Sequence, residues 1–255
     1  MAGVTALLLA GRRPGVDPLA RAVGVALKAL IPVAGEPMVA RVARTLLATP
    51  GIARVLVLTQ DTDAIAAVLP DDPRIAVAPS QAGIARSVAA VAGSAAAPWP
   101  LLVTTADHAL LTPATVAAFL ADAGSDDVAV GVVERRVLHA RFPDNRRTWL
   151  KFGGGWWTGA NLFRLNGPGA LPLVDLWSGV EADRKKGWKL VARFGPWLLL
   201  RALTRTISLP AAVAAAGQRI GVTARAVPLA DPLAAVDVDK PSDLMLARAV
   251  LEGRA

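Results

Sequence analysis

Short apolar segments alternate with helix-forming segments through the first half of the chain. Apolar runs of roughly four to eight residues are typical of strands that are buried on both faces. Helices of about ten residues between such strands permit the parallel crossovers of a doubly wound sheet. The pattern therefore predicts an α/β fold with a mainly parallel sheet. The expected strands are 4–9, 53–59, 74–78, 99–105 and 127–133, and the expected helices are 36–48, 62–69 capped by Asp61, 83–95, and 113–123 capped by Thr112.

The regular alternation breaks after Glu134 and returns near residue 220. We interpret residues 135–217 as an insertion into one domain that spans 1–255, because no linker divides the chain and insertions in such folds carry binding sites. The elements expected in this part are a strand at 161–165, helices within 170–216 interrupted at Gly195-Pro196, strands at 220–227 and 234–238, and a helix from Pro241.

The composition excludes several classes of protein. The chain has no cysteine, which excludes disulfides, cysteine-based zinc sites and a thiol nucleophile. The apolar start, Val4 to Leu9, follows no cationic stretch, so we interpret it as a strand rather than a signal peptide. No apolar run approaches the ~20 residues of a membrane-spanning helix. We expect a cytoplasmic location, with peripheral contact at the inner face of the membrane as a further possibility.

Positive charge is concentrated in the third quarter of the chain. The net charge is +8, from 28 basic and 20 acidic residues. Such clustering suits an anionic partner, whether a phosphorylated small molecule, a nucleic acid or an anionic membrane face. The basic residues concerned are Arg135, Arg136, Arg141, Arg146, Arg147 and Lys151, followed by Arg184, Lys185, Lys186, Lys189, Arg193, Arg201 and Arg205.

A glycine turn follows the first strand. It reads Ala10-Gly11-Arg12-Arg13, with Lys28 and then Gly35-Glu36-Pro37 downstream. Backbone N–H groups and guanidinium groups in such a turn can wrap a triphosphate, and a nearby lysine can neutralise the phosphate that is transferred. The turn is therefore a candidate phosphate site.

Two further acidic segments stand at strand ends. Asp107 ends an apolar strand, where ligands of open α/β sheets bind, although an aspartate there can also cap a turn. Asp237 and Asp239 would share a face if a strand ran through both. We expect Asp239 to cap the helix at Pro241, and Asp243 to be a first-turn acid favoured by the helix dipole.

In this order, the three segments resemble the motifs of the MobA-like nucleotidyltransferases. That superfamily includes molybdenum-cofactor guanylyltransferase and methylerythritol-phosphate cytidylyltransferase. The resemblance runs from residue 7 to residue 244, with two departures: Arg12 replaces a common glycine, and Leu27 replaces a proline that often precedes the lysine. It implies a Rossmann-like, GT-A type sheet and an enzyme that transfers a nucleoside monophosphate from an NTP to a phosphorylated acceptor.

The resemblance also implies roles for individual residues. Asp107 would bind Mg²⁺, and Asp237 is our preferred second ligand, with Asp239 as the alternative. The acceptor phosphate is already an anion, so the reaction needs no general base, and catalysis is positioning plus charge neutralisation. The nucleotide would be bound by Ala10, Gly11, Arg12, Arg13, Lys28, Gly83 and Ser87, of which Lys28, Arg12 and Arg13, together with Asp107, are the expected catalytic groups.

The base and the acceptor are assigned from two other segments. Gly83 to Val88 is similar to the cytosine-binding segment of the cytidylyltransferases, with a compressed Arg86-Ser87 spacing, so CTP is favoured over GTP. Asn161 corresponds to a strand start that faces the acceptor in related enzymes. Arg146, Arg147 and Lys151 would grip the acceptor phosphate, or alternatively form a solvated basic hairpin.

A stripe of basic residues has two interpretations. Lys185, Lys189 and Arg193, then Arg201 and Arg205, repeat every four residues beside apolar positions. This pattern fits helices that lie on anionic lipid, and it equally fits helices packed on the core with their charges in water.

Two other functions compete with nucleotidyl transfer. A nucleotide-sugar glycosyltransferase can share this sheet but would need an Asp-x-Asp at the strand end, where Asp107 is followed by His108-Ala109. A non-enzymatic nucleic-acid binder would explain the charge alone, and the aromatic residues form no stacking platform. We therefore expect no nucleic-acid partner.

Overall fold

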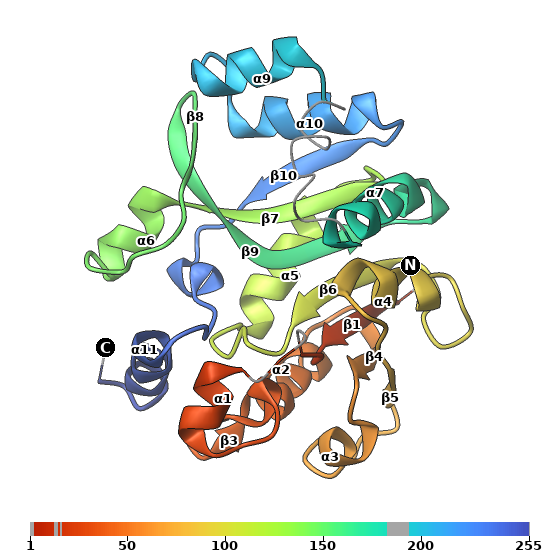
Figure 1. The fold of residues 1–255 in the computed structure, drawn as a ribbon, viewed down its shortest axis with the longest axis vertical. Coiled ribbons are helices and arrows are strands. Elements are labelled where there is room, and N and C mark those ends of the chain that lie inside the picture. The colour runs from red at the N-terminus through yellow and green to blue at the C-terminus, as the bar shows by residue number, and fades with distance from the viewer. Residues whose placement is uncertain (1–2, 13–14, 16, 183–193, 255) are drawn as a thin grey trace.

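The computed structural model of the chain describes residues 3–12, 15, 17–182 and 194–254 (Figure 1). Strands and helices alternate along the first half, as expected. The strands are β1 (Val4–Leu9), β2 (Pro32–Val33), β3 (Glu36–Pro37), β4 (Ile52–Thr59), β5 (Ile75–Pro79), β6 (Leu101–Thr105), β7 (Val128–Glu134), β8 (Leu150–Phe152), β9 (Gly155–Leu165) and β10 (Ala224–Pro228). The α-helices are α1 (Pro18–Val23), α2 (Met38–Leu47), α3 (Thr62–Ala66), α4 (Ile84–Val91), α5 (Pro113–Asp122), α6 (Arg135–Arg141), α7 (Leu171–Ala182), α9 (Pro196–Leu203), α10 (Leu209–Arg219) and α11 (Pro241–Leu251).

One mixed sheet organises the described part of the chain. Its strand order is β10-β7-β9-β6-β1-β4-β5, with β8 paired to β9. β1 pairs in parallel with β4 and β6, whereas β9 lies antiparallel between β6 and β7. The mainly parallel sheet is confirmed, and the long strand of the expected insertion is one of its central members.

Alternating side chains of the central strands enter two different cores, one on each face of the sheet. Ala6 and Leu8 of β1 pack in the larger core with α2, α5 and α11, whereas Leu7 and Leu9 pack in the second core with α4 and α7. Successive strand residues point to opposite faces, so a strand covered on both sides must be apolar throughout. Figure 1 shows the resulting layers of helices around the sheet.

Local cap signals mark several helix starts correctly. The side chains of Asp61 and Thr112 accept hydrogen bonds from the backbone N–H groups of Ala64 and Thr115 at the starts of α3 and α5. The helix expected from residue 36 begins instead at Met38, because β2 and β3 pair as a two-stranded hairpin. Helices α1 and α6 were not expected from the sequence.

The prediction of a strand at 234–238 is wrong. The chain forms a 3₁₀ helix there, η4 (Pro232–Ala235), in which the Asp231 carboxylate accepts the N–H of Leu233 at 2.9 Å. Pro232 lacks an N–H group and its fixed φ favours the turn over a sheet ladder. The strand expected from residue 220 begins later, because Gly221, at φ 79°, turns the chain after α10.

No helix in the described ranges combines the length and apolar character needed to span a membrane.

The packing of α5 on the sheet predicts a stability difference. Phe119 is completely buried in the larger core, whereas Met245 on α11 is 70% exposed. Phe119→Ala should lower the free energy of unfolding by about 3–5 kcal/mol, because truncation leaves a cavity. Met245→Ala should change it by less than about 0.5 kcal/mol. Urea denaturation of both variants checks this; equal effects would contradict the described core.

Candidate active site

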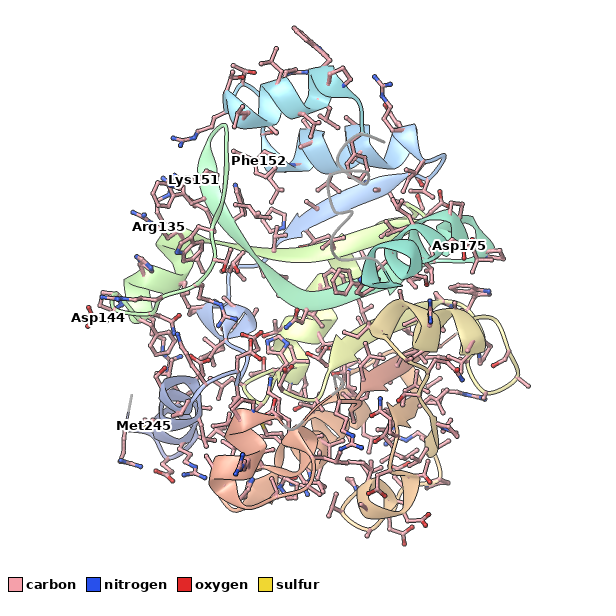
Figure 2. All side chains as sticks on the ribbon, viewed as in Figure 1. Arg135, Asp144, Lys151, Phe152, Asp175 and Met245 are labelled. Carbon is pink, nitrogen blue, oxygen red and sulfur yellow. The ribbon has the colours of Figure 1, made fainter. Side chains whose placement is uncertain are left out.

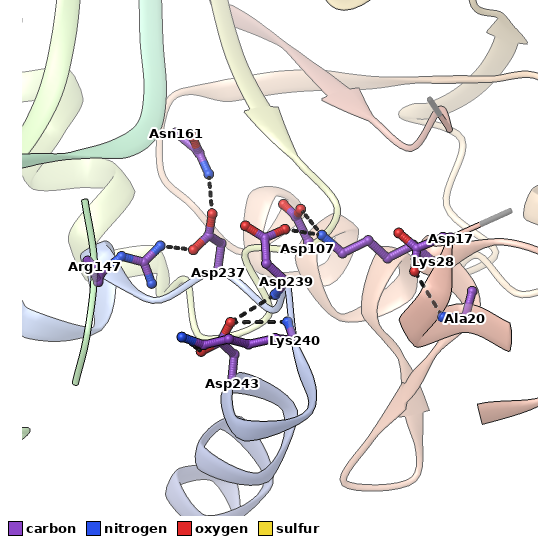
Figure 3. A network of polar contacts seen from close by, with 10 residues as sticks. All are labelled: Asp17, Ala20, Lys28, Asp107, Arg147, Asn161, Asp237, Asp239, Lys240 and Asp243. Atoms are coloured by element: carbon purple, nitrogen blue, oxygen red, sulfur yellow. Dashed lines mark hydrogen bonds and ion pairs between the residues drawn. The ribbon is translucent and has the colours of Figure 1, made fainter. Parts of the chain in front are cut away.

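An ammonium group joins two carboxylates at the carboxyl edge of the sheet (Figure 3). Lys28 Nζ lies 2.6 Å from Asp107 Oδ2 and 2.5 Å from Asp239 Oδ1. Asp107 follows β6, and Lys28 begins the 3₁₀ helix η1 (Lys28–Leu30) after the first strand. The Asp239 side chain is 63% exposed, whereas that of Lys28 is 19% exposed. The cluster is therefore held by the fold on one side and open to solvent on the other.

The environment of Lys28 keeps it charged. Burial alone would lower the pKa of Lys28, but attraction and hydrogen bonds from Asp107 and Asp239 outweigh it, so the pKa is raised above its ordinary value. A permanently protonated lysine at this edge is suited to neutralising phosphate oxygens. It is not suited to acting as a base.

Asp239 reaches the cluster because α11 is capped by another residue. Asp243 Oδ2 accepts hydrogen bonds from the backbone N–H groups of Asp239, at 3.1 Å, and Lys240, at 3.2 Å. The expectation that Asp239 caps this helix is therefore wrong. The N-cap position is Lys240, and the first-turn carboxylate that accepts the free backbone N–H groups is that of Asp243. This arrangement leaves the Asp239 carboxylate directed at Lys28.

Asp237 lies in a different polar group. It forms an ion pair with Arg147, and its Oδ2 accepts a hydrogen bond from Asn161 Nδ2 at 3.2 Å (Figure 3). Burial lowers the pKa of Arg147, an effect that the carboxylates of Asp243, Asp239 and Asp107 oppose. The structure therefore places Asp237 against a guanidinium and an amide, and Asp239 against Lys28.

Asn161 has a strained backbone. Its φ is 49°, in the left-handed region, although it lies inside β9. The β7–β9 register shifts between Val130 and Val132 next to it. Asparagine tolerates this conformation better than most residues, and such strain is concentrated at functional positions. The irregularity directs the Asn161 amide towards Asp237.

The glycine turn after β1 is held by a residue that sequence reasoning missed. The backbone N–H of Arg12 donates to Gln60 Oε1 at 2.7 Å, and Gln60 Nε2 donates to the Arg12 carbonyl at 3.3 Å. A Cβ added to Gly11 would lie 3.1 to 3.3 Å from the Gln60 amide and the Ser80 hydroxyl. Ala10 is buried at the end of the strand. Arg13 lies outside the described residues.

Gly83 and Ser87 shape the loop before α4. The Ser87 hydroxyl accepts the N–H of Gln81 at 2.9 Å and donates to the Gly83 carbonyl at 2.7 Å. Ser87 is 4% exposed, and Gly83 has a φ of 123° that favours glycine. The hydroxyl of Ser87 thus orders the loop through its backbone.

The three basic residues expected to grip an acceptor are separated. Arg147 joins the Asp237 group, whereas Arg146 is exposed. Lys151 Nζ lies 4.3 Å from the ring centroid of Trp156, and the guanidinium carbon of Arg135 lies 4.1 Å from the same centroid. Arg147 is thus the one of the three that the structure connects to the site.

His108 is buried next to Asp107 and is unsuited to proton transfer. Burial lowers its pKa to about 4, and the attraction of Asp107 only partly opposes this. The imidazole is therefore neutral near pH 7, and it is 1% exposed. We assign it a packing role.

The donor set at this edge fits a divalent cation. Asp107 Oδ1 is buried and has no hydrogen-bond partner among the described residues, while its Oδ2 and an oxygen of Asp239 converge on one ammonium. The described residues contain no group of three His, Asp or Glu ligands. Mg²⁺ commonly takes one or two protein carboxylates and completes its shell with water and substrate phosphates. Asp107 and Asp239 meet that requirement.

Comparisons with known proteins identify the family of the chain. The family model of the MobA-like NTP transferase domain matches residues 10–152. A hypothetical transferase from Thermus thermophilus is 30% identical, with a TM-score of 0.80 over 95% of this chain and 99% of that one. No curated protein sequence matches the chain.

Two more distant solved structures share the fold. A CMP:2-keto-3-deoxy-manno-octonic acid synthetase complexed with CTP is 14% identical, with a TM-score of 0.60 over 99% of this chain and 100% of that one. A 2-C-methyl-D-erythritol 4-phosphate cytidylyltransferase from Thermus thermophilus is 17% identical, with a TM-score of 0.55 over 98% of this chain and 99% of that one. The matched segment begins at the glycine turn and includes Lys28 and Asp107, and the chain therefore belongs to the MobA-like NTP transferase family of nucleotidyltransferases.

Proposed function

We propose that this nucleotidyltransferase uses Mg²⁺ to move a nucleoside monophosphate from an NTP onto a phosphorylated small molecule or lipid head group, with release of pyrophosphate. The observation that carries the proposal is the position of Lys28 between Asp107 and Asp239 at the carboxyl edge of the sheet. Open α/β sheets bind their ligands at this edge. We further propose that the reaction takes place in the cytoplasm.

In the proposed reaction, an acceptor phosphate oxygen attacks the α-phosphorus of the NTP. The new P–O bond forms as the bond to the β-phosphate oxygen breaks, and pyrophosphate leaves. Lys28 neutralises the charge that accumulates on the phosphates, and the turn at Gly11 and Arg12 positions them. Mg²⁺ held by Asp107 and Asp239 would supply Lewis-acid stabilisation of the same charge.

The site supports an acceptor that is already ionised. His108 is buried and neutral near pH 7, and Lys28 is held protonated, so neither is placed as a general base. A phosphate nucleophile requires no base, unlike a sugar hydroxyl. This chemistry favours a phosphorylated acceptor, which we place beside Asn161 and Arg147.

For the nucleotide, we propose CTP first and GTP second. One support is the ordered loop at Gly83 and Ser87. The other is that one structural relative is described as complexed with CTP and another as a cytidylyltransferase.

Pyrophosphate release tests the proposed function. Purified protein with Mg²⁺ should release pyrophosphate from one of the four NTPs when a suitable phosphorylated sugar, polyol or head group is added. Lys28→Ala and Asp107→Ala should lower the rate by about 10²-fold or more. The first removes a positive charge at the transferred phosphate, and the second removes a ligand of the proposed Mg²⁺. Asp122→Ala, at an exposed position on α5, is the matched control and should retain full activity. Wild-type activity in either site variant would refute the assigned roles.

Substitution of Asn161 tests where the acceptor binds. Asn161→Gly removes the amide and keeps a residue that accepts the φ of 49°. The KM for the acceptor should rise roughly fivefold to tenfold, the effect of about one hydrogen bond, while the KM for the NTP changes less than twofold. Steady-state kinetics with each substrate varied in turn would measure both constants. A rise confined to the NTP constant would place the acceptor elsewhere.

A further inference from the structure

Helix α9 directs three of its five large apolar side chains outwards. Trp197 is 66% exposed, Leu200 is 48% exposed and Leu203 is 82% exposed, and α9 contains no buried residue. These three residues are spaced by three positions and so follow one side of the helix. We call Trp197, Leu200 and Leu203 the α9 outer face.

The exposure of three large apolar side chains on a helix of eight residues is unusual. A surface helix of a globular protein turns its apolar stripe to the core and its polar side to water. In α9 the partly covered positions are Leu198, Leu199, Arg201 and Ala202, and Arg201 Nη2 donates to the Thr206 carbonyl at 3.3 Å. Among the described residues, α9 contacts β8 and α10, and these contacts leave the α9 outer face exposed.

The surroundings of this face carry positive charge. The sequence from Phe194 to Ala230 contains no aspartate or glutamate. It contains Arg201, Arg205 and Arg219, as well as Arg225, which is paired with Asp126. β8, which contacts α9, adds the exposed Lys151 and Leu150, the latter 53% exposed. Figure 2 shows Lys151 on β8 in the half of the molecule that contains α9. Apolar and cationic groups are thus adjacent here.

We propose that the α9 outer face docks the protein on an anionic phospholipid surface. Tryptophan and leucine side chains enter the interfacial region of a bilayer, and nearby arginine and lysine side chains attract anionic head groups. A second copy of this chain fits the surface poorly, because it would bring the exposed Arg205 and Lys151 of one copy towards the same residues of the other. The proposal concerns binding alone and does not depend on the proposed reaction.

Vesicle flotation tests this proposal with the full-length protein. The protein should float with vesicles of phosphatidylcholine containing about 40% phosphatidylglycerol at low salt, and not with vesicles of phosphatidylcholine alone. Binding should weaken at least about fivefold in roughly 0.5 M NaCl, because salt screens the electrostatic part. With this lipid composition, surface charge dominates the binding, and salt should therefore weaken it by the stated amount.

Matched variants identify the surface that binds. Leu203→Glu should weaken partitioning into the anionic vesicles by about tenfold or more, since it replaces an inserted apolar group with a repelled charge. Met245→Glu makes the same kind of change at another exposed position and should bind like the wild type. Trp197→Ala combined with Leu203→Ala provides a second variant without a new charge, and thermal melts verify that each variant folds.

Three results would overturn the proposal. They are absence of flotation with anionic vesicles at low salt, equal binding by wild type and both α9 variants, and a lipid-free wild-type dimer that Leu203→Glu dissociates. The last result, measured by light scattering, would assign the α9 outer face to self-association.

Discussion

The ammonium group of Lys28 holds together a site built from distant parts of the chain. It contacts Asp107, 79 positions away, and Asp239, 211 positions away. Two carboxylates that converge on one point repel each other unless a cation lies between them, and partly buried charges require such partners. The end of β6, the start of η1 and the segment before α11 therefore depend on a shared positive charge. The same charge balance is the reason that we propose this edge as the site of a metal ion and phosphates.

The fold supplies the positions for this charge balance. Parallel pairing of β1 with β4 and β6 brings three features to one edge of the sheet: the turn at Gly11, the Gln60 side chain that hydrogen-bonds this turn, and Asp107. The antiparallel strand β9 enters the middle of the sheet and presents Asn161 to Asp237 at the same site. Two acidic residues that are near neighbours in sequence thus serve different polar groups. Asp239 faces the side that we assign to the NTP phosphates, and Asp237 faces the side that we assign to the acceptor.

Continuous apolar strands made the sheet predictable, and strand-end position made Asp107 and the glycine turn predictable. The arrangement of Asp237 and Asp239 could not be predicted, because the prediction assumed a strand at 234–238. Pro232 and the Asp231 cap produce a 3₁₀ helix there instead. Gln60 follows β4 directly, so the strand-end rule that found Asp107 could also have found it. Of the basic stripe, Lys185, Lys189 and Arg193 lie outside the described residues, and the exposure of α9 depends on tertiary contacts that periodicity does not encode.

Our central proposal is that Asp107 and Asp239 bind the metal ion beside Lys28. Titration with Mn²⁺ in the presence of a non-hydrolysable NTP analogue, followed by the electron paramagnetic resonance signal of the free ion, tests this directly. We predict one bound ion in the wild type and at least tenfold weaker binding in Asp107→Asn and Asp239→Asn, about the effect of losing one ligand. Asp237→Asn should bind like the wild type. Loss of binding in Asp237→Asn with wild-type binding in Asp239→Asn would contradict the account.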